Sequence, residues 1–410
     1  MWYFSWGEGE CPLECALSRE ACADREELCL APELEDLLLR SPVVLLCMLS
    51  GSDAGAAAHQ AGPPDGRAVA ATQPLTDPSP LGNREALTEG SLRPKRFEDF
   101  VGQTRVIENL KVALEAARVR EEPPDHVLLS GPPGLGKTTL ARILSTELGT
   151  HLHTTSGPAL DRPRDLVGIL SNLQRGDVLF VDEIHRVPIS VEEYLYSAME
   201  DLSIDLTVND GPAARIVQLR LEPFTLVGAT TREGLLSAPF RARFGLLERF
   251  EPYPPEDLET IVLRSAGVLG MQLEPAAAAE IARRSRGTPR VANRLLARVR
   301  DLAQVERVEL VPAALVCACM DRLGVDAEGL EEIDRQLLRY LARDPVTPVG
   351  LKTLAAALGE SEDTIEEVLE PHLLREGLLH KTARGRQITP AGCQAVGRSG
   401  SASAGGELFS

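Results

Sequence analysis

Short apolar runs alternate with amphipathic helices through the middle of the chain. The pattern predicts buried strands at His126–Ser130, Asp177–Val181 and Phe224–Ala229, and helices at Thr104–Arg118 and Lys137–Leu148. Strands that are apolar along their whole length are typical of parallel sheets covered on both faces. The sequence therefore predicts an α/β fold, a parallel sheet with helices on both faces.

One stretch departs from this alternation. Residues 203–221 hold two runs of alternating apolar and polar positions around Asn209-Asp210-Gly211. An Asp-Gly pair between two such runs is a strong indication of a β-hairpin. We therefore expect a hairpin inserted between two strands of the sheet.

Only helices are predicted after Tyr253-Pro254-Pro255. Because proline is tolerated in a first helical turn, Thr288 is the expected N-cap of the helix that carries Arg290. We expect a small all-helical domain with helices at Pro255–Gly267, Pro275–Arg286, Pro289–Val305 and Val311–Leu323.

A third unit follows Gly324. Its pattern predicts a last helix that is kinked at Pro371, and then a β-ribbon at Leu378–Thr389. Three helices and a ribbon are the elements of a winged helix. The expected helices are Leu330–Arg343, Gly350–Leu358 and Ser361–Glu376.

The first 90 residues differ in composition from the rest. Residues 51–90 are rich in Ala, Gly, Pro and Ser and have no helical or strand periodicity, which is typical of disordered chain. Residues 1–90 carry fifteen acidic and five basic residues, a net charge of −10 out of −18 for the whole chain. We therefore expect a disordered acidic extension. Because it holds more than half of the net charge, the electrostatic field of each other domain has to be judged from that domain's own charges.

Composition excludes several classes of protein. With 43% hydrophobic and 25% charged residues, the 410-residue chain is expected to form two to four domains with hydrophobic cores. Eight cysteines are too few to staple such a fold, and the spacing of those between Cys11 and Cys47 does not fit zinc ligation. The longest apolar candidate, Pro42–Leu49, is too short to span a membrane, and no cationic signal peptide is visible. We therefore expect a cytoplasmic protein.

The strongest motif is GPPGLGKT at Gly131–Thr138, which fits G-x-x-x-x-G-K-[ST] between a predicted strand and a predicted helix. Glycines let backbone N–H groups approach phosphate closely, the Lys137 ammonium reaches the β- and γ-phosphates, and the Thr138 hydroxyl ligates Mg²⁺. A glycine-proline turn with a chance Lys-Thr is the alternative, and the strand–helix context argues against it. The motif predicts ATP and Mg²⁺ as cofactors.

A buried strand ends in two carboxylates, Asp182 and Glu183. Both are expected at the carboxyl edge of the sheet, where folds of this class bind ligands. Next to the phosphate loop, Asp182 is expected to hold Mg²⁺ through water and Glu183 to orient the attacking water. Solvated acids at a strand end are the alternative when the motif is taken alone.

Two further sets of residues have more than one interpretation from the pattern alone. Thr230 and Thr231 end the next strand at the same edge, where a hydroxyl either contacts the γ-phosphate or only closes a turn. Arg241 and Arg243 follow on the same side, either as an arginine finger or as solvated surface residues.

Taken together, these residues resemble the AAA+ ATPases, and within them the RuvB family of bacterial Holliday-junction branch-migration motors. The resemblance runs from Leu92 to about Gly397, roughly three quarters of the chain. RuvB chains usually have only a short polar arm before this region, so nothing is carried over to residues 1–90. Beyond the generic ATPase motifs, the resemblance rests on Phe100–Gln103, Thr154–Pro158, Asp182–Arg186, Gly211–Arg215, Gly228–Arg232, Gly287–Arg290 and Val325–Gly329.

The resemblance implies roles for the ambiguous residues. Thr231 rather than Thr230 would be sensor 1, and Arg290 would be sensor 2. Arg243 would be the finger that reaches the nucleotide of a neighbouring subunit, a contribution worth ~10³ to 10⁵ in rate. With Lys137, Asp182 and Glu183 these are the predicted catalytic residues. The nucleotide would be held by Leu92, Arg93, Gly134, Gly136, Lys137, Thr138, Thr139, Glu200, Asp201, Leu202, Arg243, Tyr253 and Arg290, and the metal by Thr138 and Asp182.

The ribbon of the third unit is the predicted DNA contact. Over residues 371–398 five bases stand against one acid, a local charge of +4 in an acidic protein. Phosphate contacts from a glycine-hinged tip carry no sequence information. The predicted DNA-binding residues are Lys381, Arg384 and Arg386, with a solvated basic turn as the alternative.

The resemblance implies an ATP-dependent DNA helicase that drives Holliday-junction branch migration in recombination, DNA repair and the SOS response. Its partners would be five further copies in a homohexamer, RuvA docked on the hairpin, RuvC, and duplex DNA at four-way junctions. The alternatives are another AAA+ DNA machine, such as a clamp-loader or helicase-loader subunit, and a nucleotide-binding scaffold without turnover. The predicted domains are the disordered extension at 1–90, a large ATPase domain at 91–252, a helical lid at 253–323, a winged helix at 324–398 and a disordered tail at 399–410.

Overall fold

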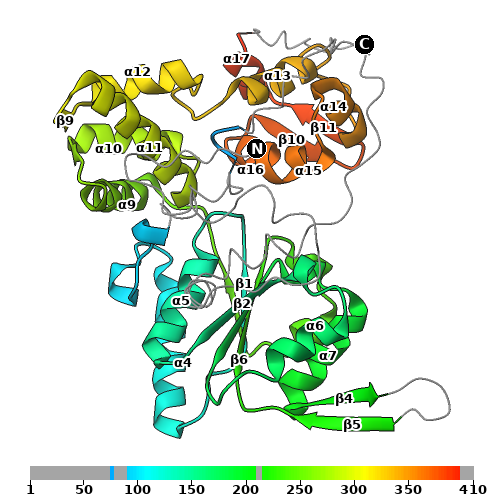
Figure 1. The fold of residues 1–410 in the computed structure, drawn as a ribbon. Helices are drawn as coiled ribbons and strands as arrows, with labels where there is room; N and C mark the ends of the chain where they lie inside the picture. The colour runs from blue at the N-terminus through cyan, green and yellow to red at the C-terminus, as the bar shows by residue number, and fades with distance from the viewer. Residues whose placement is uncertain (1–73, 78–89, 209–214, 398–410) are drawn as a thin grey trace, which may run out of the picture. The chain divides into compact units, whose positions relative to one another are not determined.

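The computed structural model describes residues 74–77, 90–208 and 215–397 (Figure 1). Its ATPase domain is built on a five-stranded sheet in the order β2-β3-β6-β1-β7, in which every neighbouring pair is parallel. The predicted parallel sheet is confirmed, and the three apolar runs form its three central strands. The strands are β1 Val127–Ser130, β2 Leu152–Ser156, β3 Val178–Asp182, β6 Thr225–Thr230 and β7 Leu246–Arg249.

Helices cover both faces of this sheet, because successive residues of a strand point to opposite sides. In β1, Val127 and Leu129 pack into one hydrophobic cluster and Leu128 packs into the other. In Figure 1 α4 and α5 lie against one face, and α6 and α7 lie against the opposite face. These helices are α4 Thr104–Arg120, α5 Lys137–Leu148, α6 Pro163–Leu170 and α7 Ile189–Asp201.

The hydrophobic pattern did not predict the two edge strands. β2 is half-exposed along its length and carries His, Thr and Ser, so it has no apolar run. β7 includes Glu248, which is 4% exposed and whose carboxylate accepts a hydrogen bond from the Asn109 side chain at 2.7 Å. Edge strands need only one covered face, and a polar partner replaces hydrophobic burial here.

The predicted hairpin is present. Its strands β4 Ser203–Val208 and β5 Arg215–Arg220 are antiparallel, with Ser203 opposite Arg220 and Val208 opposite Arg215. The predicted Asn209-Asp210-Gly211 turn lies outside the described residues. Ile204 is 1% exposed and belongs to the core beneath α7, so only part of this hairpin is available to a partner.

Four helices form the lid, as predicted. They are α9 Pro255–Val268, α10 Pro275–Arg284, α11 Pro289–Glu306 and α12 Ala313–Leu323, with the two-residue parallel strands β8 Gln272–Leu273 and β9 Leu310–Val311 between them. Thr288 occupies the N-cap position of α11, but its hydroxyl does not cap the helix. It donates instead to the Arg286 carbonyl, so Thr288 is confirmed as the N-cap residue by its position alone.

The third unit has the helices and ribbon of a winged helix. The predicted kink before Pro371 is a π-helical segment, Ile365–Leu369, which separates α15 from α16. Proline has no N–H to donate to the preceding turn, and a π-bulge is one way for a helix to absorb that loss. The elements are α13 Glu332–Leu341, α14 Leu351–Leu358, α15 Glu362–Thr364, α16 Glu370–Arg375, β10 Leu379–Thr382, β11 Gly385–Ile388 and α17 Pro390–Ala395.

Short helical turns connect several of these elements. They are η1 Phe97–Asp99, η2 Gly157–Ala159, η3 Ile184–Arg186, η5 Glu233–Leu235 and α8 Ala238–Arg241.

Five residues of the expected disordered extension are placed, Pro74–Asp77 and Gly90. Pro74–Asp77 forms a turn closed by a hydrogen bond from the Asp77 N–H to the Pro74 carbonyl, 3.1 Å. Thr76 and Asp77 are buried. For these residues the expectation of disorder is wrong, and for residues 1–73 and 78–89, which lie outside the described ranges, it stays a prediction.

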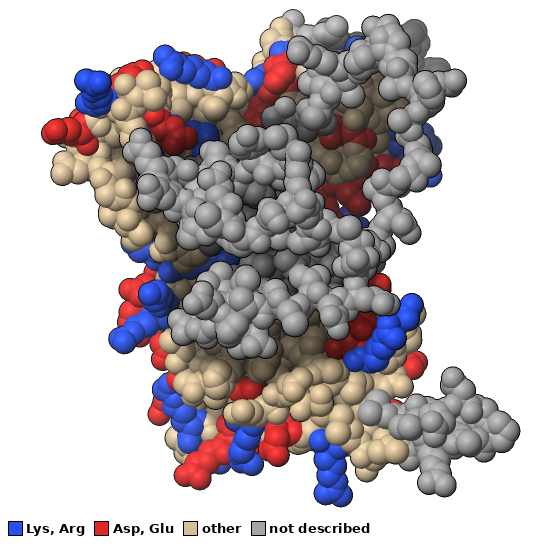
Figure 2. Space-filling view, in the orientation of Figure 1, with Lys and Arg blue, Asp and Glu red and all other residues tan. Residues whose placement is uncertain are grey.

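Charge is finely mixed on the described surface. Figure 2 shows acidic and basic side chains interspersed over the part of this face that the structure describes. Many are ion pairs between exposed groups, such as Arg298 with Asp301. In the described ranges no helix is long and apolar enough to cross a bilayer.

Candidate nucleotide site

The phosphate loop connects β1 to α5, and its glycines adopt backbone angles that other residues avoid. Gly131, Gly134 and Gly136 have φ values of 137°, 79° and 104°. A Cβ on Gly131 would lie 2.7 Å from the Phe250 carbonyl oxygen. Glycine is therefore required by both backbone angle and space, and the loop delivers the first N–H groups of α5 to the cavity beside it.

Lys137 begins α5 and is only 6% exposed. Its ammonium donates to the carbonyls of Gly131 and Pro132 at 2.7 and 2.8 Å, which folds the side chain over the loop. Burial lowers the pKa of Lys137 to about 8, against the opposing effect of the Glu183 and Asp182 carboxylates. A phosphate entering this loop would offer a buried cation a better partner than two carbonyls.

The two carboxylates at the end of β3 line the same cavity as the loop. Asp182 Oδ1 accepts the Glu183 N–H at 3.0 Å, and Glu183 has φ 47°, a left-handed angle that turns its side chain away from the strand. The Glu183 carboxylate accepts a hydrogen bond from the Thr231 hydroxyl at 3.1 Å and lies 3.2 Å from His185 Nδ1. Glu183 is therefore held from two sides.

The two threonines at the end of β6 have different partners. Thr230 is fully buried, with its hydroxyl 3.0 Å from His185 Nδ1 and accepting the Arg232 N–H. Thr231 contacts the Glu183 carboxylate directly. Of the two, only Thr231 touches an acid of the cavity, which favours it over Thr230 as the sensor.

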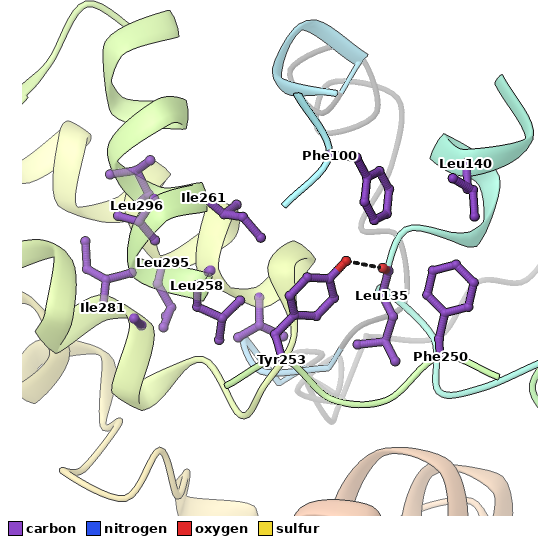
Figure 3. Packing of buried hydrophobic residues seen from close by; sticks show 14 of the residues in the cluster. Phe100, Leu135, Leu140, Phe250, Tyr253, Leu258, Ile261, Ile281, Leu295 and Leu296 are labelled. Atoms are coloured by element: carbon purple, nitrogen blue, oxygen red, sulfur yellow. Dashed lines mark hydrogen bonds between the residues drawn. The ribbon is translucent and has the colours of Figure 1, made fainter. Parts of the chain in front are cut away.

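The cavity is about 890 Å³, part of it open to solvent, and the lid closes one side of it. Tyr253 anchors this junction, because its hydroxyl donates to the Leu135 carbonyl of the phosphate loop at 3.2 Å (Figure 3). Burial raises the pKa of Tyr253, which stays a neutral donor. The structure brings nine predicted nucleotide-binding residues to the cavity wall: Leu92, Arg93, Gly134, Gly136, Lys137, Thr138, Thr139, Tyr253 and Arg290.

Four predicted nucleotide-binding residues do not line this cavity: Glu200, Asp201, Leu202 and Arg243. Arg243 pairs with Glu200 at 2.8 Å, donates to the Tyr196 hydroxyl, and lies over the Tyr196 ring at 4.5 Å. Glu200, Asp201 and Leu202 do not line the cavity of their own chain, and their part in nucleotide binding stays a prediction. They end α7, where Glu200 holds the arginine predicted to serve a neighbouring chain.

The donor set suits magnesium bound together with a nucleotide. The Thr138 hydroxyl and the Asp182 carboxylate line one cavity, and in the described residues no three His, Cys, Asp or Glu side chains form a metal cluster. Mg²⁺ prefers oxygen ligands and is commonly held by one or two protein groups together with phosphates and water. The residues present therefore fit this ion without an all-protein cage.

Sequence patterns missed several residues of the site. His185 joins Glu183 to Thr230, and Tyr196 holds Arg243. Arg264 and Asn293 line the cavity from the lid. Asn293 lies three residues after Arg290 on α11, and His185 lies two residues after Glu183, so spacing was a signal for both. Tyr196 and Arg264 reach the site residues only in the folded chain.

The predicted DNA-contacting residues have unequal surroundings. Arg386 is 7% exposed and forms a buried ion pair with Glu370, which raises the pKa of Arg386. Lys381 is half-exposed but pairs with Glu366 at 2.9 Å, while Arg384 is exposed at the ribbon tip. Arg386 is committed to the domain's own acids, so its prediction as a direct DNA contact is corrected to a structural role.

Comparison with known proteins identifies the lineage. Residues 92–250 match the model of the Holliday junction DNA helicase RuvB P-loop domain, residues 253–326 the RuvB AAA lid domain, and residues 327–397 the RuvB C-terminal winged helix domain. The chain belongs to the RuvB family. It is thus a P-loop AAA+ ATPase of the branch-migration motors, and the clamp-loader or helicase-loader alternative is not favoured.

Relatives of the RuvB family are similar over almost their full length. The Holliday junction branch migration complex subunit RuvB of Chlorobium luteolum is 56% identical over 312 residues, 76% of this chain and 91% of its own. That of Lacticaseibacillus casei is 54% identical over 318 residues, 77% and 94%. The solved Thermotoga maritima RuvB Holliday junction branch migration motor has a TM-score of 0.69 at 48% identity, over 75% of this chain and 99% of its own.

Proposed function

We propose that this RuvB-family chain hydrolyses ATP with Mg²⁺ to drive branch migration at four-way DNA junctions. The proposal rests above all on one cavity in which the phosphate loop, the Asp182–Glu183 pair and the lid residue Arg290 converge. Such a cavity senses a nucleotide from both domains, which is what a motor needs to convert hydrolysis into lid movement.

Each cavity residue has a distinct task in this proposal. Lys137 binds the β- and γ-phosphates, and Thr138 and Asp182 hold Mg²⁺, which neutralises phosphate charge when bound. Glu183 orients the attacking water, and Thr231 keeps the carboxylate aligned through its 3.1 Å hydrogen bond.

Arg243 acts on the nucleotide of a neighbouring copy. It does not line the cavity of its own chain, and its present partners Glu200 and Tyr196 lie on α7. A residue needed for hydrolysis but held outside its own site implies a head-to-tail ring, for which we propose a homohexamer.

The remaining partners attach outside the ATPase core. RuvA docks on the β4–β5 hairpin, where Val217 is 50% exposed, and RuvC joins the complex at the junction. Lys381 and Arg384 of the ribbon contact DNA phosphates, with Arg386 supporting the ribbon from beneath.

A strand-displacement assay on a synthetic four-way junction tests the proposal. We expect ATP-dependent separation of the arms that RuvA stimulates, and none with Lys137→Ala. Val217→Asp should lose the stimulation by RuvA and keep DNA-independent hydrolysis. Hydrolysis without any displacement in the presence of RuvA would contradict the branch-migration assignment.

A further inference from the structure

The turn Pro74–Asp77 is held against residues more than 200 positions away. The N–H groups of Leu75 and Thr76 both donate to the Glu331 carboxylate, the first at 3.1 Å. The Arg294 guanidinium donates to the carbonyls of Leu75, at 3.0 Å, and Asp77. One short turn therefore provides hydrogen-bond donors to the Glu331 carboxylate and acceptors to the Arg294 guanidinium.

The two charged partners are buried, which gives these bonds their weight. Arg294 is 6% exposed and Glu331 is 9% exposed. Removing a charge from water is costly unless it is paired or hydrogen-bonded. The two successive N–H groups of the turn form a concave site that binds the Glu331 carboxylate. Carbonyl oxygens on the same turn accept hydrogen bonds from the Arg294 guanidinium.

The partners belong to two elements that matter for the motor. Arg294 is on α11, four residues after Arg290, so the two side chains emerge from one face of that helix. Glu331 is the N-cap residue of α13, the first helix of the winged helix, and its N–H donates to Asp334 at 2.8 Å. The turn thus ties the sensor helix of the lid to the start of the DNA-binding domain.

We propose that Pro74–Asp77 is a strap that positions α11, and through it Arg290, at the nucleotide cavity. The strap lies outside residues 92–397, which the RuvB family models match. The inference rests on the proposed role of Arg290. It assigns a positioning task to residues that composition alone places in a disordered extension.

Substitution of Thr76 in the full-length chain tests the strap. Thr76→Pro removes one N–H donor to Glu331 and disturbs the turn, whereas Thr76→Val keeps every backbone bond. The Thr76 hydroxyl is buried and has no hydrogen-bond partner among the described residues, so valine is a matched control. We expect Thr76→Pro to raise the KM for ATP about fivefold or more with kcat little changed, and Thr76→Val to match the original chain.

The same substitution in an Arg290→Ala background separates positioning from general loosening. If the strap acts through Arg290, Thr76→Pro adds no further increase in KM, because the group being positioned is already gone. An unchanged KM in Thr76→Pro, or an equal increase in both backgrounds, overturns the inference.

Two additional measurements keep the strap testable if Thr76→Pro fails to fold or if the proposed role of Arg290 is wrong. Arg294→Met removes the guanidinium Nη1 that donates to both carbonyls, and it should raise KM in the same direction even if Thr76→Pro fails to fold. If Arg290→Ala alone leaves KM and hydrolysis unchanged, the proposed role of Arg290 fails, and the strap's positioning task fails with it. A silent Thr76→Pro beside an impaired Arg290→Ala rejects the strap alone.

Discussion

The nucleotide cavity and the DNA-binding ribbon both carry basic residues, but they use them in opposite ways. Lys137 is buried and donates hydrogen bonds to two loop carbonyls, which a phosphate can replace. Arg386 is equally buried but bound to the Glu370 carboxylate, which is 2% exposed. The Lys137 ammonium, bound only to neutral carbonyls in these hydrogen bonds, can still pair with an anionic ligand. The Arg386 guanidinium is already neutralised by a buried carboxylate.

This difference shows what a local charge count means. The +4 of residues 371–398 suggested three equivalent phosphate contacts. Lys381 and Arg386 are neutralised by Glu366 and Glu370, which lie just upstream of residues 371–398 in the sequence. The kinked helix places these two acids against the ribbon. The local net charge therefore has to be summed over residues that are close in the folded structure rather than over residues that are close in the sequence.

The largest expected effect concerns Arg243, whose partners in a single chain are Glu200 and Tyr196. Arg243→Ala should lower the rate of ATP hydrolysis by about 10³-fold or more while nucleotide affinity stays near normal. Mixing it with Lys137→Ala should recover part of the rate, because each chain supplies what the other lacks. Steady-state ATPase assays on mixed assemblies measure this, and no recovery would place the finger within its own chain.

The next effect tests the carboxylate side of the cavity. Glu183→Gln keeps the size and hydrogen-bonding span of the side chain but loses the negative charge, so hydrolysis should fall about 10²- to 10⁴-fold. A fluorescent ATP analogue should still bind, in contrast with Lys137→Ala. Thr231→Val, which removes only the hydroxyl that holds Glu183, should cost less than Glu183→Gln. A normal hydrolysis rate in Glu183→Gln would remove this residue from the mechanism.

The ribbon prediction compares two arginines two residues apart. Arg386→Ala removes the buried partner of Glu370 and leaves it the half-exposed Lys381 at 3.5 Å, so it should lower the free energy of unfolding of the winged helix by about 3 kcal/mol. Arg384→Ala should leave stability unchanged and reduce the slope of log DNA affinity against log salt by about 0.9. Thermal melts and salt titrations with duplex DNA measure both. The reverse assignment of effects would show that Arg386 is the DNA contact after all.

The smallest effect is a pH dependence that only the nucleotide cavity should show. With the pKa of Lys137 at about 8, its ammonium form prevails at pH 7 and is the minor form at pH 9. ATP affinity should therefore weaken by up to about tenfold per pH unit above 8, whereas DNA affinity, which depends on Arg384, should not. Lys137→Arg should abolish the pH dependence whatever its affinity. Isothermal titration at several pH values measures it, and a flat profile would refute the lowered pKa.

Motifs with fixed spacing made the nucleotide site predictable from the sequence. The loop Gly131–Thr138 needs consecutive residues on one strand–turn–helix, and Asp182 and Glu183 need only a strand that ends at the same edge. Parallel strands bring their carboxyl ends together, so local patterns were enough to place these groups side by side.

Tertiary structure decided the rest, because the deciding contacts join distant parts of the chain. Only folding brings Glu200 to Arg243 and away from the cavity, and only folding buries Arg386 against Glu370. Composition predicted disorder for Pro74–Asp77, since a polar segment cannot bury apolar surface. The segment is held instead by hydrogen bonds to Arg294 and Glu331, whose charges need partners once the lid and winged helix have buried them.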